Sequence, residues 1–120
     1  NINHQIIISD FLNHDHFSNK KYDIILFNPP YIRSDDVCNL EEKIKFFEPI
    51  TALDGGKDGL IFYKHIYTVL NRLLNKNGFL VMEHGFDQLD DIKNIFQNDY
   101  QVKAFSDLHC VVQGNVVNQL

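Results

Sequence analysis

A continuous apolar stretch that stops at a pair of prolines is the feature that most restricts the fold of this chain. Residues 22–27 read YDIILF, in which only Asp23 is charged, and Pro29-Pro30 follow almost at once. An apolar run without alternation is typical of a strand in a parallel sheet that is covered on both faces. Proline has no N–H to give to a strand ladder, so the strand must end before Pro29. The sequence therefore predicts a buried parallel strand that leads into a rigid loop.

Further apolar patterns predict more strands and a long helix. Residues 6–8 are three isoleucines and residues 79–83 read FLVME, and each run predicts a buried strand. Apolar residues recur at helical spacing over residues 60–74. Asp58 is placed to cap this helix and Gly78 to end it.

The second half of the chain continues the alternation of helices and strands. Residues 40–47 predict a short helix closed by Pro49, and residues 87–98 predict a helix with an acidic first turn. Residues 101–105 and 110–117 predict two strands, which we expect to pair antiparallel because they follow each other closely. The order of elements indicates an α/β fold.

Charge and cysteine content narrow the functional classes. The net charge of −5 argues against a nucleic-acid partner, because such proteins usually present a basic face to phosphate. The two cysteines lie far apart without a CxxC pair, which favours a reducing, cytoplasmic location. No apolar run approaches the roughly 18–20 residues that span a bilayer. The six histidines lack the spacing of zinc ligands, so we expect no metal and no membrane contact.

The loop Asn28-Pro29-Pro30-Tyr31 carries the chemistry that the sequence predicts. Ligands of open parallel sheets bind beyond the carboxyl ends of the strands, where this loop lies. The side-chain oxygen of Asn28 can accept one N–H of a planar NH₂ group, and the carbonyl of Pro29 the other. Pro30 stiffens the loop, and Tyr31 can lie against the flat target. Such a site positions a poorly nucleophilic nitrogen for methylation without a strong base.

Several alternatives remain open at this point. The four loop residues would accept a planar amide or an adenine amine alike, and a rigid turn after a strand is the structural alternative. Glu48 and Glu83 are the carboxylates nearest the loop in sequence. A general base is one role for them, but hydrogen bonding to loop backbone is favoured. His84 lies near a strand end, and a structural role is favoured for it too.

The sequence resembles the HemK/PrmC family, the protein-(glutamine-N5) methyltransferases of peptide-chain release factors, over residues 9–108. The matching segments are Ser9-Asp10-Phe11, Phe27-Asn28-Pro29-Pro30-Tyr31-Ile32, Phe47-Glu48-Pro49, Ala52-Leu53, Gly55-Gly56, Asp58-Gly59-Leu60 and Glu83-His84-Gly85. The Asn-Pro-Pro-Tyr loop is shared with DNA and RNA adenine methyltransferases, whereas the segments that follow it are more particular to this family. The resemblance therefore favours glutamine over an adenine base.

The resemblance implies a fold, a cofactor and roles for individual residues. It implies a class I methyltransferase fold with a seven-stranded sheet, and S-adenosylmethionine as methyl donor. Asn28, Pro29, Pro30 and Tyr31 would hold the glutamine amide, with Asn28 also bordering the cofactor. Asp10 and Phe11 match the segment that contacts the adenine end of S-adenosylmethionine. A release factor is the implied partner.

The sequence departs from the family in three ways: two of them suggest a partial domain, and the third suggests an altered edge of the sheet. The glycine-rich cofactor loop with the acidic ribose ligand is absent, and so is the N-terminal helical domain. The family usually has Gly and Arg after Asp107-Leu108, where this chain continues with His109. We therefore expect residues 1–120 to be the C-terminal portion of the catalytic domain. Residues 6–8 would then lack strand partners, residues 22–27 would expose an unpaired edge, and S-adenosylmethionine would bind weakly or not at all.

Two other functions are compatible with these observations. An adenine-N6 methyltransferase acting on DNA or RNA would use the same loop, although the acidic charge and the family-specific segments count against it. A non-catalytic module that only binds a partner would fit the missing glycine-rich loop.

Overall fold

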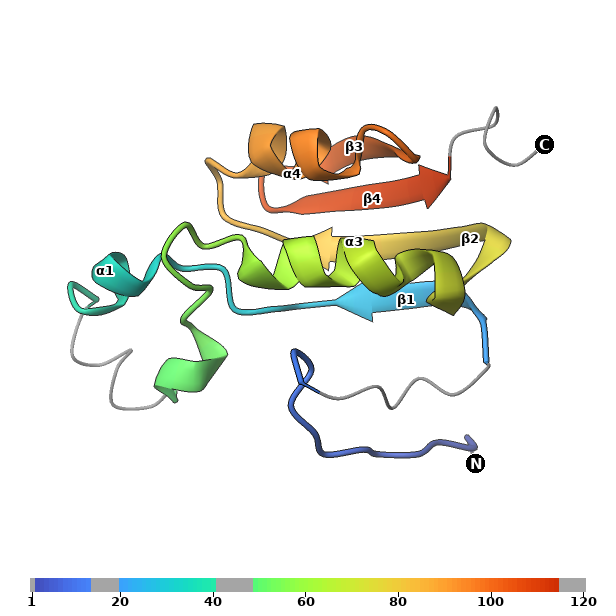
Figure 1. The fold of residues 1–120 in the computed structure, drawn as a ribbon, viewed down its shortest axis with the longest axis horizontal. Helices are drawn as coiled ribbons and strands as arrows, with labels where there is room; N and C mark the ends of the chain where they lie inside the picture. The colour runs from blue at the N-terminus through green and yellow to red at the C-terminus, as the bar shows by residue number, and fades with distance from the viewer. Residues whose placement is uncertain (1, 14–19, 41–48, 115–120) are drawn as a thin grey trace.

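The computed structural model describes residues 2–13, 20–40 and 49–114 of the 120-residue chain. The elements of this part follow one another along the chain as a mixture of strands and helices (Figure 1). They are β1 (Tyr22–Phe27), α1 (Ser34–Val37), the 3₁₀ helix η1 (Ile50–Ala52), α3 (Ile61–Leu73), β2 (Leu74–Glu83), α4 (Leu89–Phe96), β3 (Tyr100–Ser106) and β4 (His109–Gly114). The predicted α/β class is confirmed.

The strands form one four-stranded sheet in the order β1-β2-β4-β3. β1 runs parallel to β2, whereas β4 pairs antiparallel with both β2 and β3. The expected antiparallel pairing of the last two strands is therefore confirmed. Because β1 and β2 are parallel, their carboxyl ends meet at the same end of the sheet, towards α1 (Figure 1).

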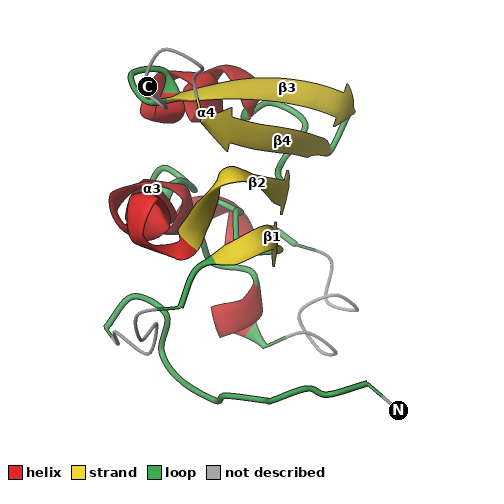
Figure 2. Cartoon of the chain, turned by 90° about the vertical axis from the view of Figure 1, so that its right-hand side faces the viewer, coloured by secondary structure: helices red, strands yellow, loops and turns green. Residues whose placement is uncertain are grey.

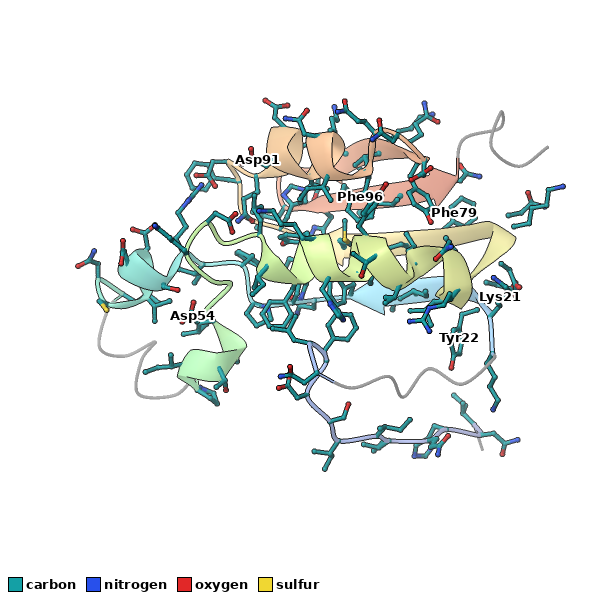
Figure 3. The ribbon with its side chains drawn as sticks, viewed as in Figure 1. Lys21, Tyr22, Asp54, Phe79, Asp91 and Phe96 are labelled. Atoms are coloured by element: carbon teal, nitrogen blue, oxygen red, sulfur yellow. The ribbon has the colours of Figure 1, made fainter. Side chains whose placement is uncertain are left out.

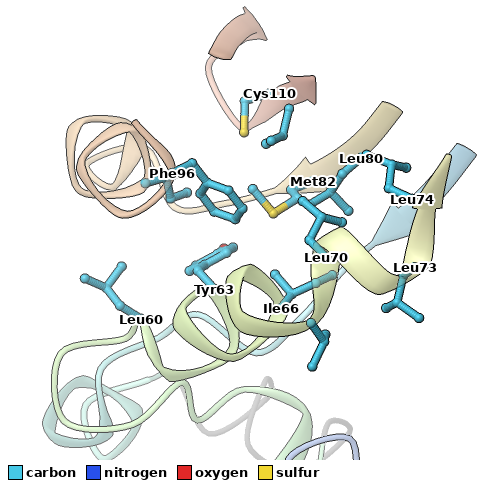
Figure 4. Close-up of a cluster of buried hydrophobic side chains, with 13 residues drawn as sticks. Leu60, Tyr63, Ile66, Leu70, Leu73, Leu74, Leu80, Met82, Phe96 and Cys110 are labelled. Carbon is cyan, nitrogen blue, oxygen red and sulfur yellow. The ribbon is translucent and has the colours of Figure 1, made fainter. Parts of the chain in front are cut away.

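The hydrophobic core lies between one face of the sheet and the helices α3 and α4, which both cover that face (Figure 2). Apolar residues of α3 recur every three or four positions, so they line a single stripe of the helix. Figure 4 shows this stripe against side chains of β2 and β4. The fully buried side chains of the core include Tyr63, Ile66, Leu70, Leu80, Met82, Ile92, Phe96, Cys110 and Val112.

The opposite face of the sheet carries apolar side chains that the described residues leave exposed. Ile24, Leu26 and Phe79 all point to this face, and Leu26 is 77% exposed. β1 is also an edge strand, because its only strand partner in the described part of the chain is β2. The sequence predicted a strand covered on both faces, and this is wrong for the described residues. The unpaired edge of β1 was expected.

Residues 6–8 do not form the predicted strand. These isoleucines belong to no helix or strand, and Ile8 is 95% exposed. A β-branched run favours extended backbone, but a strand needs partners for its N–H and C=O groups. No other strand in the described ranges lies beside this segment. The run of isoleucines was therefore not sufficient to form a strand, because no neighbouring strand pairs with it in the described ranges.

Gly78 does not end the long helix, as the sequence had suggested. α3 ends at Leu73, and Leu74 is already extended, with φ −104° and ψ 129°. β2 begins there, and its register against β1 shifts between Tyr22 and Ile24. A Cβ atom on Gly78 would lie 2.8 Å from the main-chain oxygen of Asp23. Gly78 therefore allows two strands to approach closely at an irregular pairing, which is a common use of glycine within strands.

Helix boundaries differ from the predictions in smaller ways. The N-cap position of α3 is Leu60 instead of Asp58, although the Asp58 carboxylate accepts the Leu60 N–H at 2.9 Å. α4 begins at Leu89, two residues after the predicted start. The predicted helix over residues 40–47 lies outside the described residues except for its first position. None of the helices in the described ranges is long and apolar enough to cross a membrane.

Two leucines on the paired strands β1 and β2 test whether one face of the sheet is buried and the other exposed. In the 120-residue chain, Leu80→Ala should lower the free energy of unfolding by about 2–5 kcal/mol, because it opens a cavity in the core. Leu26→Ala should change it by no more than about 0.5 kcal/mol, because that side chain is already hydrated. Urea denaturation of both variants measures the difference. Equal losses would show that the exposed face is covered in solution.

The two cysteines should differ sharply in their rates of alkylation. Cys110 is fully buried, and burial raises the pKa of its thiol to about 11. The reactive thiolate is therefore almost absent at pH 8, and the sulfur is also shielded. Cys38 is exposed. Mass spectrometry after iodoacetamide treatment should find one label on the native chain, at Cys38, and two after unfolding. Rapid labelling of Cys110 in the native chain would contradict the core described above.

Candidate functional site

The 28–31 loop leaves β1 at the end of the sheet where β1 and β2 both terminate. Asn28 is exposed, Pro29 is buried, and Pro30 and Tyr31 are half-buried. Asn28 lines a small hollow of about 220 Å³ together with Met82, Glu83 and others at the carboxyl end of β2. The predicted loop thus lies where an open α/β sheet binds its ligands.

A larger hollow, of about 710 Å³, also borders the loop. Asp10 and Phe11 line it, as do Pro30 and Asp54. The structure therefore brings the predicted cofactor-binding residues Asp10 and Phe11 to the same hollow as one proline of the loop. Asn28 lines the smaller hollow instead, so the predicted site residues are divided between two hollows.

Asp10 is exposed and holds a local turn. Its carboxylate accepts the main-chain N–H of Leu12 at 3.1 Å and the side-chain amide of Asn13 at 2.5 Å. Aspartate commonly forms turns of this kind with the backbone two residues ahead. The turn places Asp10 and Phe11 beside each other at the rim of the larger hollow.

Phe11 attaches the N-terminal segment to the rest of the fold. Its ring centroid lies 5.3 Å from that of Phe27 at the end of β1, and 5.0 Å from the ring of His65 on α3. Phe62 of α3 stacks on it at 6.4 Å. Aromatic contacts at these distances are favourable. One part of Phe11 therefore packs on β1 and α3, while another lines the hollow.

The segment over residues 53–56 runs beside the loop and fixes its path. The N–H of Ile32 donates to the carbonyl of Leu53 at 3.0 Å, and the carbonyl of Ile32 accepts the N–H of Gly55 at 2.7 Å. One step further, the N–H of Ser34 donates to the carbonyl of Gly56 at 2.9 Å. The structure shows a short parallel pairing, and this is what the Ala-Leu…Gly-Gly run provides.

Asp54 and Gly55 make this pairing possible. The Asp54 carboxylate accepts the Ser34 hydroxyl at 2.6 Å and the Gly56 N–H at 2.9 Å. These two hydrogen bonds, the first above all, lower the pKa of Asp54. A Cβ atom on Gly55 would lie 2.8 Å from the Cα of Tyr31 and 2.9 Å from the carbonyl oxygen of Pro30. A side chain at this position would push the loop away.

Tyr31 is held through its hydroxyl group by the end of β2. This hydroxyl donates to the carboxylate of Glu83 at 3.0 Å, and the Tyr63 hydroxyl donates to the main-chain carbonyl of Glu83 at 2.9 Å. Burial and then the Glu83 carboxylate raise the pKa of Tyr31, so it stays a protonated donor near neutral pH. Glu83 therefore orients the Tyr31 ring. Glu48, the other carboxylate considered, lies outside the described residues.

Gln88 is a site residue that the sequence analysis missed. Its side chain is 1% exposed, and its amide oxygen accepts the N–H of Gly85 at 2.8 Å. Its amide nitrogen donates to the carbonyls of Tyr31 at 2.9 Å and Gly59 at 3.3 Å. Helical spacing could have identified it, because Gln88 lies four residues before the buried Ile92 and so on the core side of α4.

His84 has a structural place. Its side chain is buried, its N–H donates to the carbonyl of Leu108 at 2.8 Å, and its ring nitrogen Nδ1 contacts the carbonyl of Gly85 at 2.8 Å. It joins the end of β2 to the β3–β4 turn. Across the described ranges, no three His, Cys, Asp or Glu side chains gather as metal ligands would.

Another hollow, of about 770 Å³, lies at the other end of the sheet. Lys21, Tyr67 and Asp99 are among its lining residues. Figure 3 shows Lys21 and Asp54 at opposite ends of the molecule. The candidate site lies at the Asp54 end, because ligands of open α/β sheets bind at the carboxyl ends of the strands.

Comparison with known proteins gives one consistent result. No family model matches the chain. The release factor glutamine methyltransferase of Clostridium acetobutylicum is 41% identical over 80 residues, which cover 67% of this chain and 28% of that protein. The protein of the same name from Clostridium botulinum is 39% identical over 103 residues, or 86% of this chain and 35% of that protein. The protein of the same name from Agrobacterium fabrum is 46% identical over 76 residues, which cover 63% of this chain and 26% of that protein.

These identities agree with the resemblance found in the motifs. The chain spans about a third of the length of the curated relatives that it matches. The shared name comes from proteins of different bacterial genera. This chain is therefore a relative of the release factor glutamine methyltransferases.

Proposed function

We propose that this chain is the C-terminal portion of a catalytic domain that methylates the side-chain amide nitrogen of a glutamine in a peptide-chain release factor. The observation that carries the proposal is the Asn28-Pro29-Pro30-Tyr31 loop at the carboxyl end of β1. The names of the relatives support the substrate. The fixed path of the loop supports a site that works by positioning.

The chemistry follows from the acceptors of the loop. An amide nitrogen is a poor nucleophile because its lone pair is delocalised. The Asn28 oxygen and the Pro29 carbonyl would each accept one of its N–H groups, which fixes the plane of the NH₂ group so that the developing lone pair, perpendicular to that plane, points at the sulfonium methyl. As positive charge develops on nitrogen, both acceptors bind more strongly, so they stabilise the transition state over the ground state. Tyr31, oriented by Glu83, would lie along the flat amide.

S-adenosylmethionine would supply the methyl group from its positively charged sulfonium. The hollow beside Asp10 and Phe11, at about 710 Å³, has the size of ordinary small-molecule sites. It offers the Asp10 carboxylate as a polar acceptor and the Phe11 ring as an apolar surface. These residues fit an adenosyl group, and Asn28, which lines the smaller hollow, would border the methyl end.

A class I methyltransferase sheet is the fold that we propose for the complete domain. The unpaired edge of β1 and the exposed isoleucines of residues 6–8 support further strands between them. The matched regions make up 28% and 35% of the length of these relatives, which supports the same conclusion. A reducing cytoplasm is the proposed location, because Cys38 and Cys110 do not form a disulfide.

Asn28→Ala tests the substrate-holding role directly. In the full-length protein, the variant should lose on the order of 10²-fold in kcat, because one acceptor for the developing charge is removed. Transfer of radiolabelled methyl from S-adenosylmethionine to a purified bacterial release factor gives the rate. Asn94→Ala, which truncates an exposed asparagine on α4, should keep the unaltered rate. Labelling of an adenine-containing oligonucleotide instead of the release factor would contradict the glutamine assignment.

The length of chain needed for cofactor binding is a second test. Calorimetric titration with S-adenosylhomocysteine should show weak or no binding to residues 1–120. A version extended upstream by about 100 residues, roughly one further domain's length, should bind it. Tight binding by the shorter chain would contradict the partial-domain proposal and would place the whole cofactor site within the described hollows.

A further inference from the structure

We propose that Gln88 is a positioning residue for methyl transfer: its buried amide fixes the Tyr31 carbonyl and thereby the loop that holds the substrate. This inference rests on the function proposed above. It concerns a residue that touches neither of the two hollows beside the loop. Gln88 would therefore act through the loop, and not by contact with a reacting atom.

The first support is the complete use of a buried polar group. The Gln88 side chain is 1% exposed, yet both ends of its amide are bonded. The partners are main-chain groups from three separate segments: Tyr31 after β1, Gly59 before α3 and Gly85 after β2. A buried amide with these partners has one orientation that satisfies it. Such an arrangement fixes three chain segments relative to one another.

The second support is the room that glycine provides around this amide. Gly59 has a φ of +75°, which an ordinary side chain rarely adopts. A Cβ atom there would lie 2.7 Å from the Tyr31 oxygen and 2.9 Å from the Gln88 amide nitrogen. The Tyr31 carbonyl and the Gln88 amide therefore meet in a space that only glycine leaves open.

The third support is the chemistry of the loop itself. Pro29 and Pro30 have no N–H groups, so the loop has no backbone donor at these two positions. Their rings also fix φ, which makes the loop a stiff unit from Asn28 to Tyr31. A stiff unit transmits a displacement of the Tyr31 carbonyl to the Pro29 carbonyl and the Asn28 side chain. Gln88 holds one end of Tyr31 and Glu83 holds the other.

Two variants of Gln88 separate its donor from its acceptor. Gln88→Met keeps the length of the side chain and removes both functions. Gln88→Glu keeps an oxygen for the Gly85 N–H, but it turns a carboxylate towards the carbonyls of Tyr31 and Gly59. Gln101→Glu, on an exposed position of β3, is the matched charge control. All are made in the full-length protein and assayed with radiolabelled S-adenosylmethionine and a purified release factor.

We expect both Gln88 variants to lower kcat about 10- to 100-fold, since a displacement of the order of 1 Å is enough for such losses. The KM for S-adenosylmethionine and the dissociation constant of S-adenosylhomocysteine should stay within about twofold of the unaltered protein, as in Gln101→Glu. This split between kcat and cofactor affinity distinguishes positioning from general damage to the fold.

The outcomes separate this inference from the proposed function. No methyl transfer by the unaltered protein would overturn the proposed function and, with it, the positioning role of Gln88. Activity in the unaltered protein, with equal kcat in Gln88→Glu and Gln101→Glu, would overturn the inference alone. Equal losses of kcat and of cofactor affinity would also overturn it. If the Gln88 variants do not fold, NMR spectroscopy of the unaltered protein tests the inference instead. A detected hydrogen bond from the Gln88 amide to the Tyr31 carbonyl supports the inference, and its absence overturns it.

Discussion

Two consecutive prolines leave the 28–31 loop without N–H donors at Pro29 and Pro30, so its position depends on groups supplied from elsewhere. The 53–56 segment pairs with the residues just after Tyr31, and Gln88 and Glu83 hold Tyr31 itself. These contacts come from segments far apart in the sequence. The carboxyl end of the sheet, the start of α3 and the start of α4 therefore take their places around one short loop.

The sequence predicted those parts whose local pattern agrees with their final environment. The strand predicted at residues 22–27, the helix predicted over residues 60–74 and the antiparallel pairing of the last two strands are confirmed, with the helix running from Ile61 to Leu73. The helix and the last two strands place apolar side chains against the core, whereas β1 places only Ile25 and Phe27 there. The prediction of a strand at residues 6–8 was wrong, because β-branched residues favour an extended backbone but do not supply a partner strand. Gly78 was misread as a helix end, since the sequence does not show how closely another strand approaches it.

The same reasoning explains how much of the site was predictable. The loop could be placed because a proline pair after an apolar run is a local signal. Its supports could not be placed, because they depend on contacts across the fold: Glu83 with Tyr31, and Gln88 with the Tyr31 carbonyl. The roles of Asp10, Phe11 and Asn28 stay predictions, made more specific by the two hollows that these residues line. The family-specific glycines now have a physical reason, which is room for the loop.

The exposed face of the sheet has a consequence for how β1 finds its alignment. Register is normally fixed because a slip by one residue would turn apolar side chains towards water. In β1 the inward pair Ile25 and Phe27 alternates with the equally apolar Ile24 and Leu26, so such a slip would exchange one apolar set for another. The register of β1 must therefore be fixed by contacts at the two ends of the strand. Asp23 accepts the Asn75 amide at 2.7 Å where β1 begins, and the prolines prevent further pairing where it ends.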